Sequence, residues 1–169
     1  RISRVVAVGA PIVGDSLSWL LKLTDRPVLA DAFVRIPWFR RYMFRLFLGE
    51  TNDPAVNEIL DDSVKSSSTT LRRSVGSMCR TDLRPELSRL SVPALIVHGG
   101  RDEIVHPNQA DLFDHIPSAE VVVMPESRHF PFLDEAELFN ETLIRFVRQD
   151  APRALPRRMR TRLNATISG

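Results

Sequence analysis

Short apolar runs and amphipathic stretches alternate along this chain and indicate its secondary structure. Val5–Val8, Val92–His98 and Glu120–Met124 are rich in β-branched residues and show no polar alternation. Such runs are typical of strands that are buried on both faces of a parallel sheet. Glycine or proline follows each run, which favours the end of a strand there. The pattern predicts about three parallel strands.

Long segments with helical spacing separate the first two of these runs. Asp15 stands where it would cap one helix, and Asp53 followed by Pro54 is typical of a cap and a first helical position in another. The apolar stripes are Leu17, Leu20 and Leu21; Phe39, Met43, Leu46 and Phe47; Val56, Ile59, Leu60 and Val64; and Leu71, Val75, Met78 and Cys79. We expect an all-helical block over residues 12–90.

Helical spacing also follows the second and third runs. We expect a short helix from Pro107 to His115, while Asp134 and Glu137 have the spacing of a capping box. The apolar stripe after that box consists of Phe139, Leu143, Phe146 and Val147. Strand and helix therefore alternate in this part, as in parallel α/β units with right-handed crossovers. The predicted fold class is α/β.

The composition fits a soluble globular protein of one domain. The chain has 169 residues, of which 43% are hydrophobic and 26% are charged. No apolar run approaches the ~18 residues that a membrane span needs, and no signal-peptide pattern opens the chain. Cys79 is the single cysteine and has no partner for an internal disulfide. These features favour a cytoplasmic location.

Positive charge is concentrated at the carboxyl end. The last 19 residues hold five arginines and no acidic residue, so the net charge of +2 becomes −3 without them. This tail lacks aromatic residues for base stacking and an apolar helical face for a lipid surface. We expect a solvated extension over residues 151–169 and no nucleic-acid partner, while the oligomeric state stays open. Arg1 stands directly before a strand-like run, so we expect that a longer protein has lost its beginning.

Ionisable residues follow the second and third predicted strands. Gly99–Glu103 comes after one strand and Glu126–His129 after the other. Because the carboxyl ends of parallel strands meet at one edge of a sheet, we expect Asp102 and His129 to lie together there. A carboxylate beside an imidazole fixes its tautomer and stabilises its protonated form, as in the acid–base half of a nucleophilic triad. The alternative is a turn aspartate and a solvent-facing histidine.

Two segments resemble the α/β-hydrolase superfamily. Asp82–Leu87 together with Ser91–Val105 is similar to the segment that carries the triad acid in that family. Ser127–Phe130, followed by proline, phenylalanine and an acidic helix start, is similar to its catalytic-histidine loop. The resemblance implies that Asp102 orients His129, which acts as general base and then as general acid.

The resemblance extends over about residues 1–148 and implies a partial α/β-hydrolase fold, with about three parallel strands, flanking helices and an inserted helical cap. The implied domains are a core strand at 1–11 after the missing nucleophile helix, the helical cap at 12–90, an α/β core at 91–150 with the acid and histidine loops, and the basic tail at 151–169. The family implies hydrolysis of an ester, or a similar acyl or carbon–carbon bond, without a cofactor. The implied substrate is a small apolar or ester-type molecule.

One motif of that family is absent from the chain. No G-x-S-x-G elbow occurs in it, and the strands that would carry the oxyanion-hole amides are missing as well. Without a nucleophile and that hole, an aligned aspartate and histidine have nothing to activate. We therefore expect the serine to come from a missing N-terminal part, and the chain alone to be inactive.

Two other functions stay open on sequence alone. Gly14–Leu17 spells the motif of GDSL-type esterases, in which Ser16 would be the nucleophile. Those enzymes resemble one another in a late Asp-x-x-His, where this chain has Glu126 in the place of aspartate, and Pro11 interrupts the strand before the motif. The other possibility is a non-catalytic binding or interaction module, since a three-stranded sheet leaves an apolar edge unpaired.

The remaining polar candidates have weaker patterns. Glu103 is the rival of Asp102 for the acid role, and Ser127 is a further hydroxyl beside the histidine. Arg101 and Arg128 flank the expected pair and would suit an anionic substrate, although solvated surface arginines are common.

Neither a metal nor a cofactor is expected. The chain has three other histidines, namely His98, His106 and His115. Their spacing is not the one at which two histidines bind a metal ion together from one helix or one loop. Several large apolar side chains of the helical block would suit either a core or an apolar pocket, and they are Trp19, Trp38, Phe39, Met43, Phe44 and Phe47.

Overall fold

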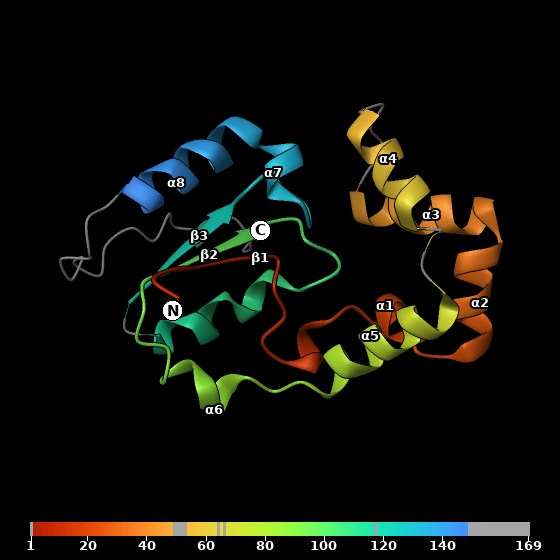
Figure 1. Cartoon of the computed structure of the whole chain (residues 1–169), viewed down its shortest axis with the longest axis horizontal. Helices are drawn as coiled ribbons and strands as arrows, with labels where there is room; N and C mark the ends of the chain where they lie inside the picture. The colour runs from red at the N-terminus through yellow and green to blue at the C-terminus, as the bar shows by residue number, and fades with distance from the viewer. Residues whose placement is uncertain (1, 49–53, 64, 66, 117, 149–169) are drawn as a thin grey trace, which may run out of the picture.

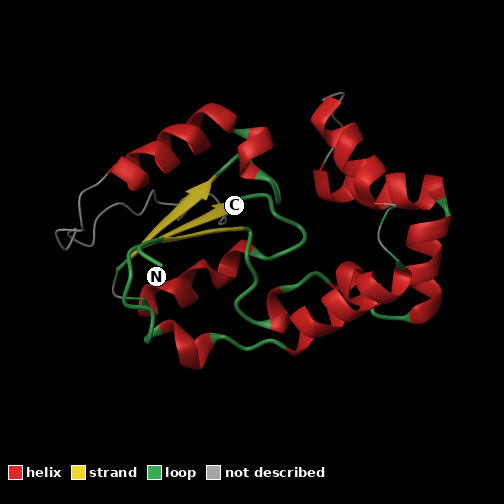
Figure 2. Cartoon of the chain, in the orientation of Figure 1, coloured by secondary structure: helices red, strands yellow, loops and turns green. Residues whose placement is uncertain are grey.

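Three strands form one parallel sheet in the computed structural model, which describes residues 2–48, 54–63, 65, 67–116 and 118–148. The sheet order is β1 (Val5–Val8), β2 (Ala94–Gly99) and β3 (Ala119–Met124). Val5 pairs with Ala94, which pairs with Ala119 on its other side. The three predicted strands are confirmed, and β2 lies between the other two (Figures 1 and 2).

Helices cover both faces of β2, and all six residues of this strand are buried. The helices of this part are η2 (Pro107–His115), α7 (Pro131–Asp134) and α8 (Ala136–Arg148). Ile96 of β2 shares a buried cluster with Phe113 of η2. Leu95 points to the opposite face and shares a cluster with Phe146 of α8. The absence of polar alternation in this strand thus reflects burial on both of its faces.

The regular elements described between β1 and β2 are helices (Figure 2). They are η1 (Gly14–Ser16), α1 (Trp19–Leu23), α2 (Pro27–Arg35), α3 (Pro37–Leu48), α4 (Pro54–Ser63), α5 (Ser68–Arg80) and α6 (Arg84–Leu87). Helix α2 contacts both α3 and α5. Helices α1 to α5 lie beside the sheet, on the side toward which its strands point (Figure 1).

A third buried cluster joins the helical block to the loop that follows β2. Leu17 and Met43 from the block share this cluster with Val105 of the loop. The backbone supports the same junction, because Leu17 forms an isolated bridge with Val105 and the Ser18 N–H donates to the Ile104 carbonyl oxygen at 2.8 Å. The helical block is therefore anchored directly beside the segment that contains Asp102.

Two predicted helix starts are wrong. Ser18, and not Asp15, caps α1, since the Ser18 Oγ accepts a hydrogen bond from the Leu21 N–H at 3.2 Å. Asp134 ends α7 instead of opening α8, and its carboxylate accepts a hydrogen bond from the Arg128 N–H. The local pattern thus favours Asp15 and Asp134 as caps, but neither side chain caps the helix that was predicted to follow it.

Other boundaries lie close to their predictions. Helix α4 begins at Pro54 as expected, and the short helix after β2 has 3-10 geometry. Strand β2 begins two residues later than expected, and Pro93 before it has no N–H to donate to a ladder. Asp53, Val64 and the predicted tail at 151–169 lie outside the described residues. No helix in the described part of the chain combines the length and the apolar character that crossing a membrane requires.

Candidate active site

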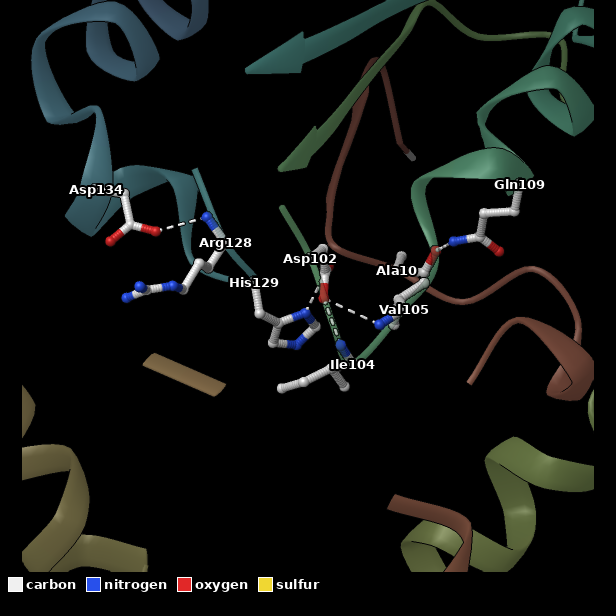
Figure 3. A network of polar contacts seen from close by, with 8 residues as sticks. All are labelled: Ala10, Asp102, Ile104, Val105, Gln109, Arg128, His129 and Asp134. Atoms are coloured by element: carbon white, nitrogen blue, oxygen red, sulfur yellow. Dashed lines mark hydrogen bonds and ion pairs between the residues drawn. The ribbon is translucent and has the colours of Figure 1, made fainter. Parts of the chain in front are cut away.

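Asp102 and His129 meet at the carboxyl edge of the sheet. The loop after β2 carries Asp102, the loop after β3 carries His129, and the His129 Nδ1 lies 2.9 Å from the Asp102 Oδ2 (Figure 3). The Asp102 side chain is completely buried, whereas the His129 side chain is 19% exposed. The predicted juxtaposition is therefore present, with the imidazole between the buried carboxylate and more open space.

Both carboxylate oxygens of Asp102 are engaged, but by different partners. Its Oδ1 accepts hydrogen bonds from the N–H groups of Ile104 and Val105, at 2.8 and 2.9 Å (Figure 3). These bonds orient the carboxylate so that Oδ2 faces His129. An ionised carboxylate only accepts hydrogen bonds, so the neutral imidazole carries its proton on Nδ1 here. Its Nε2 is then left with a lone pair that can take up a proton.

Glycines at two strand ends allow the loops to come this close. Gly9, directly after β1, has a φ of +57°, and a Cβ atom there would lie 3.0 Å from the His129 Cε1. A Cβ atom on Gly99 would overlap the carbonyl oxygen of Arg128. Only glycine adopts such a positive φ readily, and only glycine leaves this space empty. Their positions in the sequence indicate strand ends only, whereas the contact with the histidine loop appears only in the folded chain.

The two loops are also bound to each other through the backbone. The Gly100 N–H donates to the Met124 carbonyl oxygen at 2.7 Å, and the Arg101 N–H donates to the Ser127 carbonyl oxygen at 2.9 Å. The Arg101 guanidinium forms an ion pair with Glu126 of the opposite loop. The Arg101 side chain thus joins the acid loop to the histidine loop.

An apolar cavity of about 400 Å³ lies between this edge of the sheet and the helical block, and His129 forms part of its wall. The block contributes Leu21, Phe33, Val34, Phe44, Leu71 and Met78. The loops after the strands contribute Ile104, Val105 and Phe130. Thr70, Ser74 and His129 are the only polar side chains among the described lining residues. Such a volume falls within the range of about 300–1,000 Å³ that small-molecule sites occupy.

The apolar side chains that suited either a core or a pocket divide between the two and the surface. Phe44 lines the cavity, but Trp19 and Trp38 are 72% and 70% exposed on the outside of the block. Met43 is buried in the core cluster that the block shares with the loop after β2. The side chain of Phe47 lies outside the described part of the structure.

Neither serine proposed as a nucleophile is available to His129. The Ser16 hydroxyl donates to the Val13 carbonyl oxygen at 2.7 Å. The Ser127 hydroxyl is fully buried and donates to Glu135 at 2.5 Å. A hydroxyl has a single proton to donate, so each of these is already committed to another acceptor.

The other candidate residues lie away from the pair or have different roles. Of the two rival carboxylates, Glu103 is exposed to solvent, whereas Asp102 is buried. His106 is exposed, and the side chain of His115 lies outside the described part. Among the described residues, no group of three or more histidine, cysteine or acidic side chains has a geometry that could hold a metal ion.

His98 is a buried imidazole on the middle strand. It has no exposed surface, and neither ring nitrogen has a hydrogen-bond partner among the described residues. Its ring centroid lies 5.4 Å from that of Phe113. Desolvation lowers the pKa of His98 from 6.5 to about 4, against the opposing effect of the Asp102 charge. The side chain is therefore neutral around pH 7.

The sequence of this chain matches a known protein family. The model that describes the alpha/beta hydrolase family matches residues 1–142. The chain belongs to the alpha/beta hydrolase family. The resemblance of the strand ends and of the two loops is thereby confirmed at the level of family and fold.

Curated relatives of this alpha/beta hydrolase chain are named as esterases. The pimeloyl-[acyl-carrier protein] methyl ester esterase of Neisseria meningitidis serogroup C is 34% identical over 89 residues, which cover 52% of this chain and 35% of that protein. A protein of the same name from Nitrosomonas europaea is 38% identical over 71 residues, which cover 41% of this chain and 28% of that protein. The chain therefore matches about a third of the length of these relatives.

Solved structures of the same family have a similar arrangement. A bromoperoxidase from Bacillus anthracis superimposes with a TM-score of 0.74 at 21% identity, covering 88% of this chain and 59% of that one. The esterase EaEST from Exiguobacterium antarcticum gives a TM-score of 0.68 at 26% identity, covering 87% and 57%. The strands and helices of this chain thus correspond to somewhat more than half of those folds.

Proposed function

We propose that this chain is the acid–base and substrate-binding part of a serine esterase. The observation that carries the proposal is the contact of the buried Asp102 with His129 at the wall of an apolar cavity. The printed names of the curated relatives support ester hydrolysis as the reaction. The helical block at 12–90 then acts as the cap that closes the cavity.

In the proposed reaction, His129 moves a proton twice. Its Nε2 takes the proton from a serine hydroxyl as the serine oxygen attacks the ester carbonyl carbon. The imidazolium then gives this proton to the departing alcohol, and Asp102 stabilises the positive charge in between. Water attacks the resulting acyl-serine by the same route, which releases the acid and restores the serine.

The cavity favours an uncharged ester with an apolar acyl or alcohol group. No charged side chain other than His129, when protonated, belongs to the described lining. Moving an unpaired charge out of water into such surroundings is strongly unfavourable, whereas an aliphatic or aromatic group gains free energy there. A small neutral ester is therefore the proposed substrate class.

The nucleophile of the proposed reaction comes from outside these 169 residues. The sequence contains no G-x-S-x-G elbow, and the hydroxyls of Ser16 and Ser127 are engaged elsewhere. Strand β1 is an edge of the described sheet, so an additional strand can pair with it there. We propose that the chain alone is inactive and that a strand carrying the serine completes the site at this edge.

The test joins residues 1–169 to a preceding segment with a G-x-S-x-G elbow, taken from a relative, and measures hydrolysis of p-nitrophenyl esters. We expect turnover that His129→Ala lowers by about 10³-fold or more. The matched control is His106→Ala, since His106 is exposed and outside the cavity wall, and it should retain activity. Undiminished turnover in His129→Ala would remove this residue from the mechanism.

The GDSL-type alternative is tested on the chain as it stands. If Ser16 were a nucleophile, a fluorophosphonate reagent would label it in the 169-residue protein and Ser16→Ala would abolish the labelling. We expect no labelling, because the buried Ser16 hydroxyl donates to Val13. Labelling of Ser16 would favour the alternative over the proposed function.

A non-catalytic interaction module is the second candidate, and the open edge at β1 favours it. Val6 in this strand is 40% exposed. A monomeric 169-residue protein that melts cooperatively would support such a module. Concentration-dependent association would instead indicate that the β1 edge requires a further strand.

A further inference from the structure

Three hydrogen bonds hold the residues that directly precede His129. The Glu126 N–H and the Ser127 hydroxyl both donate to the Glu135 Oε2, at 3.1 and 2.5 Å. The Arg128 N–H donates to the Asp134 Oδ2 at 2.7 Å (Figure 3). Two consecutive carboxylates at the junction of α7 and α8 thus bind three consecutive residues of the loop. We call Asp134 and Glu135 the carboxylate clamp.

Ser127 connects the clamp to the loop that carries the acid. Its side chain is completely buried, so water cannot replace Glu135 as the acceptor of its hydroxyl proton. Its carbonyl oxygen accepts a hydrogen bond from the Arg101 N–H at 2.9 Å. One residue therefore binds Glu135 through its side chain and the neighbour of Asp102 through its backbone.

The ring of His129 has additional neighbours that limit its sideways movement. The Phe130 ring packs edge-on against it, with centroids 4.8 Å apart. Gly9 lies so close that even a methyl group there would be 3.0 Å from the ring. These contacts restrict the ring itself, and the Arg101 N–H holds the loop at the Ser127 carbonyl oxygen. The hydrogen bonds of the carboxylate clamp hold the same loop from the side of α7 and α8.

We propose that Glu135 and Asp134 are positioning residues that keep the His129 Nδ1 within hydrogen-bond reach of the Asp102 Oδ2. Neither is among the described residues that line the cavity, and they act through the loop backbone and the Ser127 hydroxyl. The role of this positioning in catalysis rests on the proposed function. The contacts themselves exist in the 169-residue chain, so they can be tested without any turnover.

The test is ¹⁵N–¹H NMR of the histidine side chains in the 169-residue protein at neutral pH. In the unaltered chain we expect a low-field Nδ1 proton signal for His129, because this nitrogen donates to Asp102. In Glu135→Ala we expect this signal to disappear and the Nε2–H tautomer to become populated. Glu135→Gln keeps an oxygen acceptor of the same reach and should restore most of the signal.

Glu137→Ala is the matched control. Glu137 is an exposed glutamate in the first turn of α8, two residues beyond the clamp, and its loss should leave the Nδ1 signal unchanged. Circular dichroism of each variant establishes that the fold is retained. A Glu135→Ala protein that is folded and keeps the full Nδ1 signal would overturn the proposal.

Further variants keep the test decisive if Glu135→Ala fails to fold. Ser127→Ala removes one of the bonds to Glu135, and Asp134→Ala removes the bond to the Arg128 N–H. Each should weaken the Nδ1 signal, and an undiminished signal in both would refute the clamp. If the clamp variants lose the Nδ1 signal but the unaltered chain joined to an elbow segment has no esterase activity, the clamp stands and the esterase proposal is contradicted. If that joined protein is active but every clamp variant keeps the full Nδ1 signal, the esterase proposal stands and the clamp is refuted.

Discussion

Acidification should destabilise this protein through His98, by an amount that the structure sets. The pKa of this buried imidazole is about 4 in the folded chain, against 6.5 when it is exposed to water. Above pH 6.5 both states are neutral at this position. As the pH falls below 6.5, the unfolded chain binds a proton that the folded chain refuses, so the free energy of unfolding decreases until about pH 4.

The expected magnitude follows from the two pKa values. Each pKa unit corresponds to about 1.4 kcal/mol, so the whole loss is roughly 3 kcal/mol and about 2 kcal/mol of it falls between pH 7 and pH 5. This is a large share of the 5–15 kcal/mol that typically separates folded and unfolded domains. Urea unfolding followed by circular dichroism at pH 7 and pH 5 measures the total change in the free energy of unfolding, from which a His98 variant isolates the contribution of this residue.

The matched comparison uses His98→Leu and His106→Leu. The first removes the buried titrating group and should flatten the pH dependence in this window, whereas the second removes an exposed histidine and should retain it. The substitution also removes two buried ring nitrogens that have no hydrogen-bond partner in the described part of the chain, which should raise the free energy of unfolding at pH 7. An equal loss between pH 7 and pH 5 in His98→Leu and in the unaltered chain would refute the reasoning, as would an NMR titration that finds His98 protonating near pH 6.5.

Three substitutions and one control, Asp15→Ala, test the local structure, each by urea unfolding at pH 7. Gly9→Ala places a side chain at φ +57° against His129 and should cost at least ~1–2 kcal/mol, together with a changed His129 imidazole spectrum. Ser18→Ala removes the cap of α1 and should cost ~1 kcal/mol, whereas Asp15→Ala should cost little. Leu95→Ala opens a cavity in the fully buried middle strand and should cost ~2–5 kcal/mol.

The outcomes that contradict these expectations are equally specific. Gly9→Ala with unchanged stability and an unchanged His129 spectrum would mean that the strand end and the imidazole do not touch in solution. A larger loss in Asp15→Ala than in Ser18→Ala would restore the capping residue that the local pattern favours. A loss well under 1 kcal/mol in Leu95→Ala would show that β2 is not tightly packed on the face that α8 covers.

The sheet and the central pair were predictable because their physical causes are local. A continuous apolar run is typical of a parallel strand that is covered on both faces, and β2 is buried in this way, whereas the edge strands β1 and β3 are only partly buried. Parallel strands end at one common edge, so the loops with Asp102 and His129 had to come together once both strands were recognised. Neither inference required knowledge of the helical block.

The parts that were missed depend on contacts between distant segments. Ser18 and Asp15 are both good caps, and the bond of the Ser18 N–H to Ile104 belongs to tertiary structure that no local pattern contains. Asp134 has the spacing of a capping box, yet its carboxylate binds the histidine loop instead. The burial of His98 with no hydrogen-bond partner among the described residues is likewise not visible in a sequence, where a histidine before glycine is typical of a strand end.

The cluster that unites Leu17 and Met43 with Val105 has a mechanical consequence. The helical block is not joined to the sheet by a loose connection at this point, because its packed contact with Val105 lies three residues from Asp102. Any opening of the helices wide enough to disturb Leu17 would pull on the backbone amides that hold the carboxylate. An exchange of this helical block for another one would have to reproduce the Leu17 contact to keep the Asp102 carboxylate in place.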